Sequence, residues 1–182
     1  MEERQGGDGG NRRLSPGAGL DEFGWRLSMA TVSEPGPFSA FPGIDRVLGI
    51  VEGEGLRLFI EGEIRTVTSK SPAVAFPGDV TVASDLLGGP VADFNLMTRR
   101  GQYVGRIDRV RGDERAGFHT QSHVTLLVAL SQCEVLGAGS SVSLGRLNAV
   151  VLDVGEGEVI ATSPSGLDLF VVAVFDKGQA TH

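Results

Sequence analysis

Short apolar runs alternate with turn-forming sequences along almost the whole chain, and this pattern constrains the fold more than any other feature. Runs rich in Val, Leu and Ile recur roughly every 8 to 12 residues, a spacing typical of β-sandwiches and β-barrels. The sequences between them are rich in Gly and Pro, as in Glu34 to Pro37 and Leu87 to Pro90. Gly accounts for 27 of 182 residues, about twice its usual share. We therefore predict an all-β chain.

Charge and hydropathy exclude several classes of partner. The net charge of -7 argues against nucleic acid and anionic membranes as partners, because both require a basic surface. No stretch approaches the roughly 20 apolar residues of a membrane span, and the first residues lack the apolar core of a signal peptide. The single cysteine, Cys133, lies in an apolar run and is expected to be a buried side chain in a reducing compartment. We expect a cytoplasmic protein.

The stretch from Phe23 to Arg46 places polar side chains where a half-buried strand usually has apolar ones. Trp25 to Val32 alternates as a strand, with Arg26 and Ser28 on one face. A Pro- and Gly-containing turn follows, and Ile44 to Val51 reads as the next strand. Polar residues that share one strand face predict either a solvent-facing surface or a polar site inside a barrel.

The second interpretation predicts a binding site for a small carboxylate. If this face lines a barrel, Arg26 and Arg46 offer fixed guanidinium donors inside an aromatic wall. The wall would consist of Phe38, Phe41 and Phe76. The alternative, which spacing alone does not separate from the first, is that both arginines face solvent or form structural ion pairs.

Asp45 and Asp79 are the expected partners in that structural alternative. A second group of arginines lies between Arg99 and Gly117, where acidic residues are interleaved with them. An anion-binding patch is one interpretation of this segment. The interleaved acids favour the other interpretation, a solvated connector that carries a short edge strand.

Specific signals for catalysis or metal binding are absent from the sequence. His119 and His123 have the spacing of a helical zinc pair, but they precede a strand-like sequence and no Glu lies between them in the protease arrangement. No Gly-x-Ser-x-Gly elbow occurs. We therefore expect neither a metal nor another cofactor. An enzyme remains the alternative to a binding protein.

The same residues resemble the HutD/Ves family of bacterial cupin proteins. The matching motifs occur in the same order from Phe23 to Arg100, and beyond this region the resemblance is a strand pattern. They are Trp25 to Ala30, Gly36 to Ser39, Phe41 to Arg46, Glu52-Gly53, Phe76, Gly78-Asp79 and Gly88 to Arg100. The chain departs from the family at residues 5–14, where only the glycines of the usual Trp-Lys-Asn-Gly-Gly-Gly opening occur.

The resemblance implies a compact double-cupin fold of two small RmlC-like jelly rolls. On this basis we expect a flexible segment over residues 1–20, a first cupin half over 21–100, a connector over 101–117 and a second half over 118–178. The resemblance also implies an association with histidine utilisation, in which a non-catalytic member binds formylglutamate or urocanate and restrains the pathway.

The expected site combines these two lines of reasoning. Arg26 and Arg46 are the predicted anion contacts. Polar orientation is assigned to Ser28, Ser39 and Asn95, and the wall to Phe38 and Phe76. The expected partner is thus a small anionic metabolite, and the oligomeric state stays open, with a homodimer as one option. The alternatives are a cupin isomerase or hydrolase acting on a small organic acid, and a scaffold with a vestigial pocket.

Overall fold

The computed structural model describes residues 12–14, 23–120, 122–137, 139–152 and 157–179. The flexible segment expected for residues 1–20 falls outside this part of the chain, apart from 12–14. The described residues form 17 β-strands and one 3-10 turn at Lys177–Gln179, with no α-helix among them. The all-β prediction is therefore confirmed. None of the helical structure in the described part is long and apolar enough to cross a membrane.

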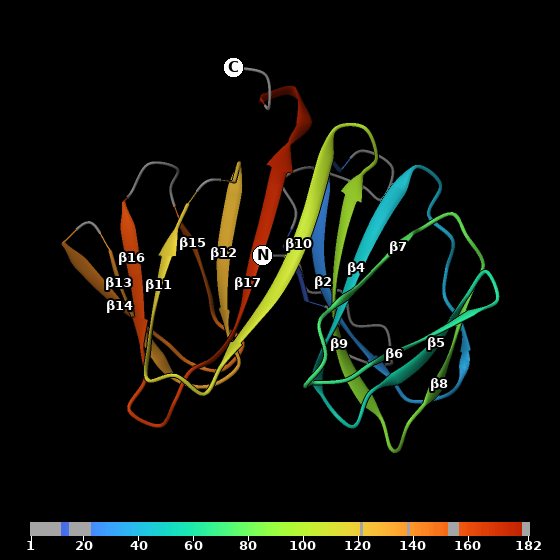
Figure 1. The fold of residues 1–182 in the computed structure, drawn as a ribbon, viewed down its shortest axis with the longest axis horizontal. Coiled ribbons are helices and arrows are strands. Elements are labelled where there is room, and N and C mark those ends of the chain that lie inside the picture. Colours follow the sequence, from blue (N-terminus) through green and yellow to red (C-terminus); the bar gives the residue numbers. More distant parts are fainter. Residues whose placement is uncertain (1–11, 15–22, 121, 138, 153–156, 180–182) are drawn as a thin grey trace.

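The first half contains two antiparallel sheets with strand orders β1-β2-β9-β4-β7 and β3-β8-β5-β6. We call the first of these the inner sheet, because it faces the second half of the molecule (Figure 1). The strands are β1 (Arg12–Leu14), β2 (Trp25–Val32), β3 (Gly36–Pro37), β4 (Ile44–Glu52), β5 (Leu56–Ile60), β6 (Glu63–Val67), β7 (Val74–Pro77), β8 (Val82–Leu86) and β9 (Val91–Arg99).

The second half repeats this arrangement, with strand orders β10-β17-β12-β15 and β11-β16-β13-β14. Its strands are β10 (Tyr103–Arg111), β11 (Arg115–His119), β12 (Val124–Ala129), β13 (Cys133–Gly137), β14 (Ser140–Leu144), β15 (Ala149–Leu152), β16 (Glu158–Thr162) and β17 (Asp168–Asp176). The expected connector, residues 101–117, contains β10, where the sequence predicts a short edge strand, and the first residues of β11. Residues on β10 alternate in exposure, with Ile107 buried against the first half.

The molecule has three main apolar layers, and the third of them joins the two halves. One fills the first half, one fills the second, and the third lies where the inner sheet packs on β10, β12 and β17 (Figure 1). Arg109 crosses this junction: its Nη1 donates to the Ile50 carbonyl at 2.8 Å, and Nε and Nη2 donate to Asp168 at 2.7 and 2.9 Å. The halves thus share a continuous core.

Strand β9 is buried on both faces because it lies in the middle of the inner sheet. Phe94 and Leu96 enter the layer between the halves, whereas Asp93 and Asn95 are buried on the opposite face. The same alternation on β2 places Leu27 in the junction. Inward-facing polar residues are therefore concentrated inside the first half.

The interior of the second half holds no buried charge among the described residues, and its buried polar side chains are the hydroxyls of Ser122, Thr125 and Ser163. Its core consists of Leu127, Ala129, Cys133, Val135, Leu144, Leu152, Val159, Ala161, Leu167 and Leu169. Burial raises the pKa of the Cys133 thiol, as expected of a side chain that serves packing. The two halves have similar frames but chemically different interiors.

Candidate functional site

Five polar side chains of the inner sheet are gathered inside the first half, each between 1% and 7% exposed. They are Arg26, Ser28, Arg46, Asp93 and Asn95. They come from three neighbouring strands, and the register explains why they meet. Ser28 is opposite Asn95 across β2 and β9, and both arginines are opposite Met97, one from each side. Buried polar groups at this density cost free energy unless they are paired or serve a ligand.

Arg46 is the centre of this cluster. Its Nε donates to Asn95 Oδ1 at 3.3 Å, and its Nη1 donates to the Ser39 carbonyl at 3.4 Å. Within the described part of the chain Arg46 forms no salt bridge. A guanidinium carries five N–H donors, so these two long contacts leave much of its hydrogen-bonding capacity for a ligand.

Three phenyl rings surround the Arg46 guanidinium. Its Cζ lies 5.0 Å from the ring centre of Phe38, 5.5 Å from Phe41 and 5.2 Å from Phe76. Phe38 and Phe76 also contact each other edge to face, with centres 6.4 Å apart. Ring faces attract a cation and exclude water, so the wall fixes the guanidinium in a low-dielectric environment.

The electrostatics of the cluster follow from burial. Burial lowers the pKa of Arg46 to about 10, an effect that Asp93 opposes and Arg26 reinforces. Arg46 therefore stays charged at neutral pH. Burial raises the pKa of Asp93 to about 7, although Arg46 opposes the rise. Near pH 7 the Asp93 carboxyl is therefore partly protonated, so it balances the charge of Arg46 only in part.

Arg100 pairs with Asp45 and Asp79, the two carboxylates that the structural alternative assigned to Arg26 and Arg46. Arg100 contacts Asp45 at 2.7 Å and Asp79 at 2.8 and 2.9 Å. These contacts hold the pKa of Asp79 down at about 2. We call this cluster the Arg100 bridge. It joins the start of β4 to the loop after β7, on the outside of the aromatic wall.

Backbone contacts complete the support of the wall. The Phe41 amide donates to the Gly78 carbonyl, and the Gly78 amide donates to the Ile44 carbonyl, both at 2.7 Å. A Cβ at position 78 would lie 2.9 Å from the Ile44 oxygen and 3.0 Å from the Phe41 oxygen, too close for any residue but glycine. The Phe-Pro-Gly sequence around Phe76 therefore packs directly on the loop that carries Phe41.

Three cavities lie near the cluster, and one of them, about 310 Å³, is lined by Arg46 and Phe76 together with Thr98 and Gly105. The other two are larger. The first of these two, which we call the β2–β3 cleft, measures about 460 Å³ and contacts the surroundings of Arg46 through Phe38 and Ser39. It is lined by Ala30, Thr31, Val32, Ser33, Glu34, Gly36, Pro37, Phe38, Ser39 and Ser84. Ala30 is opposite Asp93 in the sheet register, so the cleft borders the cluster on two sides.

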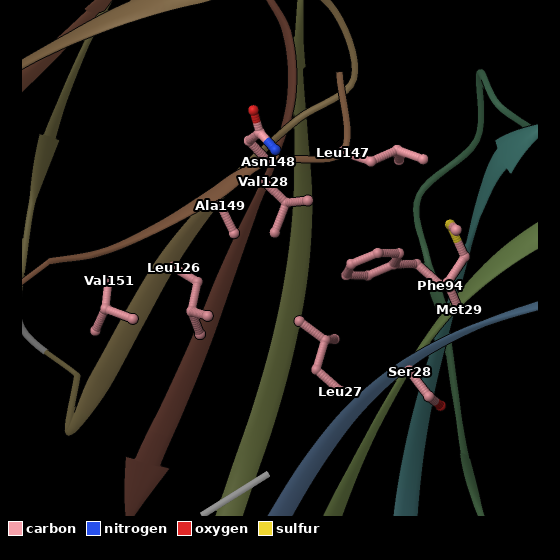
Figure 2. A pocket seen from close by; sticks show the side chains of 10 residues that line it. All are labelled: Leu27, Ser28, Met29, Phe94, Leu126, Val128, Leu147, Asn148, Ala149 and Val151. Carbon is pink, nitrogen blue, oxygen red and sulfur yellow. The ribbon is translucent and has the colours of Figure 1, made fainter. Parts of the chain in front are cut away.

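The second cavity, about 440 Å³, lies between the halves and is mainly apolar (Figure 2). Leu27, Met29 and Phe94 line it from the inner sheet, opposite Leu126 and Val128 of β12. Ser28 borders this cavity, but its hydroxyl points away from the apolar side chains in Figure 2. Neither Arg26 nor Arg46 lines this cavity.

The structure brings most of the predicted site residues together. Arg26, Ser28, Arg46, Phe76 and Asn95 are buried inside the first half, as the barrel interpretation requires. Phe38 is half-buried in the wall, and the exposed Ser39 contributes its carbonyl rather than its hydroxyl to Arg46. Whether these residues bind a ligand stays a prediction.

Sequence reasoning did not assign two buried polar residues to the site. Asp93 is 1% exposed, and its Oδ1 has no hydrogen-bond partner within the described part of the chain. Ser84 is 4% exposed and faces the cluster from the opposite sheet. The sequence does hold a signal for Asp93, because it shares one face of its strand with Asn95. It holds no comparable signal for Ser84.

His119, His123 and the arginines from Arg106 onward lie away from the cluster. His119 is on β11, and the His123 ring contacts Tyr103 in a tilted arrangement with ring centres 6.0 Å apart. Across the described ranges no three His, Cys, Asp or Glu side chains converge as a metal site would require. In the arginine segment, Arg106 pairs with Asp108 at 2.6 Å, and Arg109 and Arg111 both pair with Asp168.

Comparison with known families identifies this architecture. The family model for HutD matches residues 6–167. The chain belongs to the HutD family. The match begins within the divergent N-terminal stretch, and β1 of this HutD-family protein pairs with β2 over Arg12–Leu14. The predicted family is therefore confirmed.

Relatives of this HutD-family chain include proteins from several bacteria. An uncharacterised 21.2 kDa protein from the hutC 3′ region of Pseudomonas putida is 37% identical over 151 residues, which is 82% of this chain and 78% of that protein. Protein Ves from Cronobacter sakazakii is 33% identical over 100 residues, or 54% of this chain and 51% of Ves.

Solved structures agree with this assignment. HutD from Pseudomonas fluorescens SBW25, determined in a formate condition, superposes with a TM-score of 0.76 at 30% identity, over 93% of this chain and 90% of that one. A conserved protein of unknown function from Pseudomonas aeruginosa PAO1 superposes with a TM-score of 0.81 at 28% identity. The superposition covers 92% of this chain and 89% of that one. A cupin 2 conserved barrel domain protein from Leptotrichia buccalis shares the fold. Its TM-score is 0.59 at 10% identity, over 94% of this chain and 91% of that one. The cupin prediction is confirmed.

Proposed function

We propose that the protein binds a small carboxylate inside its first half and modulates histidine utilisation without catalysing a step. Formylglutamate and urocanate are the candidate ligands. The single observation that carries this proposal is the buried Arg46 guanidinium, which forms no salt bridge with any described residue and is walled by three phenyl rings.

The physical argument rests on charge compensation. A buried cation costs several kcal/mol unless an anion or hydrogen-bond acceptors offset its lost hydration. Arg46 has two long neutral contacts and a carboxyl neighbour, Asp93, that is only partly ionised near pH 7. A carboxylate ligand supplies both the missing charge and a planar pair of acceptors for the guanidinium.

Context supports the choice of ligand class. A relative of this chain comes from the hutC 3′ region of Pseudomonas putida, and a similar HutD structure was determined in a formate condition. The β2–β3 cleft, at about 460 Å³, falls within the size range of small-molecule sites. Phe38 and Ser39 connect this cleft to the guanidinium.

The decisive experiment is isothermal titration calorimetry with formylglutamate, urocanate and formate. A charge-assisted contact contributes about 1.5 to 3 kcal/mol, so Arg46→Ala should weaken binding by roughly 10- to 150-fold. Arg57→Ala is the matched control, because Arg57 is an exposed arginine on β5 of the same half. It should leave affinity unchanged.

Two outcomes contradict the proposal. Absence of binding of all three compounds at millimolar concentration rules out these candidate ligands. Unchanged affinity in an Arg46→Ala protein that retains its circular dichroism spectrum and melting behaviour assigns the arginine to structure instead.

One observation favours the enzyme alternative. Asp93 has a pKa of about 7, and a buried carboxyl that titrates near neutral pH suits general acid–base chemistry. This alternative predicts that urocanate or formylglutamate is converted, and that Asp93→Asn abolishes the conversion. Proton NMR of each compound incubated with the protein separates turnover from binding.

A further inference from the structure

Asp93 is a buried carboxyl whose position is not accounted for by the hydrogen bonds of Arg46. It is 1% exposed, and within the described residues its Oδ1 has no hydrogen-bond partner. It lies on the same face of β9 as Asn95, which accepts from Arg46. A buried carboxyl oxygen without a partner costs about 1 to 3 kcal/mol, so this arrangement is a poor structural counter-ion for Arg46.

We propose that Asp93 is a third ligand contact, which takes up one proton as the anion binds and donates a hydrogen bond to it. The inference rests on the proposed carboxylate site and deepens it. Arg46 would supply charge to one ligand oxygen, and the protonated Asp93 would supply a neutral donor to the ligand. The proton comes from solvent, so one anion and one proton enter the site together.

The surroundings of Asp93 support a neutral carboxyl in the bound state. Its neighbours in the sheet register are Ala30 on β2 and Ile50 on β4, neither of which is charged. The charged group that acts on it from these strands is Arg46. Arg26 shares the face but is opposite Met97, whereas Asp93 is opposite Ala30. The inward side chains of the opposite sheet are not titratable: Leu56, Leu58, Ile60, Val67, Val82 and Ser84.

Electrostatics give the direction of the coupling. Burial already raises the pKa of Asp93 to about 7 in the empty site, and a bound anion beside it raises the pKa further by like-charge repulsion. Arg46, with a pKa of about 10, stays charged over the same range. Binding therefore draws in a proton above about pH 7 and none below about pH 6.

The size of the effect follows from proton linkage. The dissociation constant for formylglutamate should be nearly level below about pH 6 and should rise about tenfold per pH unit above about pH 7, or roughly 30-fold from pH 6.0 to pH 8.5. Titration calorimetry in two buffers of different ionisation enthalpy should report uptake of about 0.9 proton per ligand at pH 8.

Variants separate a hydrogen-bond donor from a simple charge. In Asp93→Asn the amide still donates, so affinity should stay within about threefold of the wild type at pH 6, with no proton uptake. Asp93→Val has similar volume without a donor and should bind at least tenfold more weakly. Asp85→Asn is the control, since Asp85 is a β8 residue that is not buried, and it should keep the full pH dependence.

The outcomes distinguish this inference from the proposed function. Binding with the same affinity from pH 6.0 to 8.5, or proton uptake that persists in Asp93→Asn, overturns the role of Asp93 and leaves the carboxylate site intact. Equal affinities of the Asn and Val variants also overturn it. Absence of binding at every pH removes both proposals. A carbon-13 NMR titration of the Asp93 carboxyl in the ligand-free protein provides an independent measurement, and a midpoint below about pH 5 contradicts the inference.

Discussion

Replacing Asp93 with asparagine should make the folding stability of the protein less sensitive to pH. The pKa of this carboxyl rises from 3.8 to about 7 in the folded state, chiefly because of burial. Between these values the folded protein keeps a proton that the unfolded chain has released. The stability that Asp93 contributes is therefore fully present below about pH 4 and is lost as the pH rises through about 7.

The magnitude follows from the shift. A rise of about three pKa units corresponds to about 4 kcal/mol across the whole range, at about 1.4 kcal/mol per unit. Between pH 5 and pH 8 the same relation gives a loss of about 2.5 kcal/mol. This window avoids the strongly acidic range in which Asp79 and Asp168, whose pKa values are lowered by arginines, are protonated.

Urea unfolding at pH 5 and pH 8 measures the effect. The difference in unfolding free energy between wild type and Asp93→Asn should change by about 2.5 kcal/mol, with the wild type relatively more stable at pH 5. Asp85→Asn should follow the wild type at both pH values. A parallel pH dependence of wild type and Asp93→Asn would refute the reasoning, because it would mean that the carboxyl is ionised in both states.

Two further predictions concern the contacts that support the site. Arg109→Ala removes three hydrogen bonds, two of them to Asp168, and should lower the unfolding free energy by about 2 kcal/mol in urea. Arg106→Ala breaks an exposed pair and should cost less than about 0.5 kcal/mol; similar losses in both variants would contradict this ranking. Arg100→Ala opens the Arg100 bridge and should speed hydrogen exchange at the Gly78 amide. Exchange in the second half should stay unchanged, and mass spectrometry measures both.

Strands with clear alternation were predictable from the sequence to within a residue or two. Trp25–Val32 matches the expected strand, and Ile44–Glu52 extends the expected range by one residue. Arg115–His119 and Ser140–Leu144 escaped prediction as strands. Four of the five side chains from Ser140 to Leu144 are exposed, so this strand shows no apolar period.

The site was predictable in part for the same reason. Arg26 and Ser28 are two residues apart, so strand periodicity predicts that they share one face. The structure buries both of them inside the first half. Strand periodicity does not tell which arginine pairs with Asp45, since Arg100 reaches it across 55 residues of sequence. The protonation state of Asp93 depends on burial by the opposite sheet, which no local pattern reveals.

Strand β9 is enclosed on both faces, so substitutions at odd-numbered and even-numbered positions disturb different parts of the molecule. Odd positions from 93 to 97 belong to the interior of the first half, and even positions 94 and 96 belong to the junction with the second. A saturation scan along this strand should therefore produce a two-residue rhythm, in which variants that alter the polar cluster alternate with variants that loosen the packing between the halves. The polar interior of the first half is thus open to redesign at every second residue of a strand whose remaining residues must be kept.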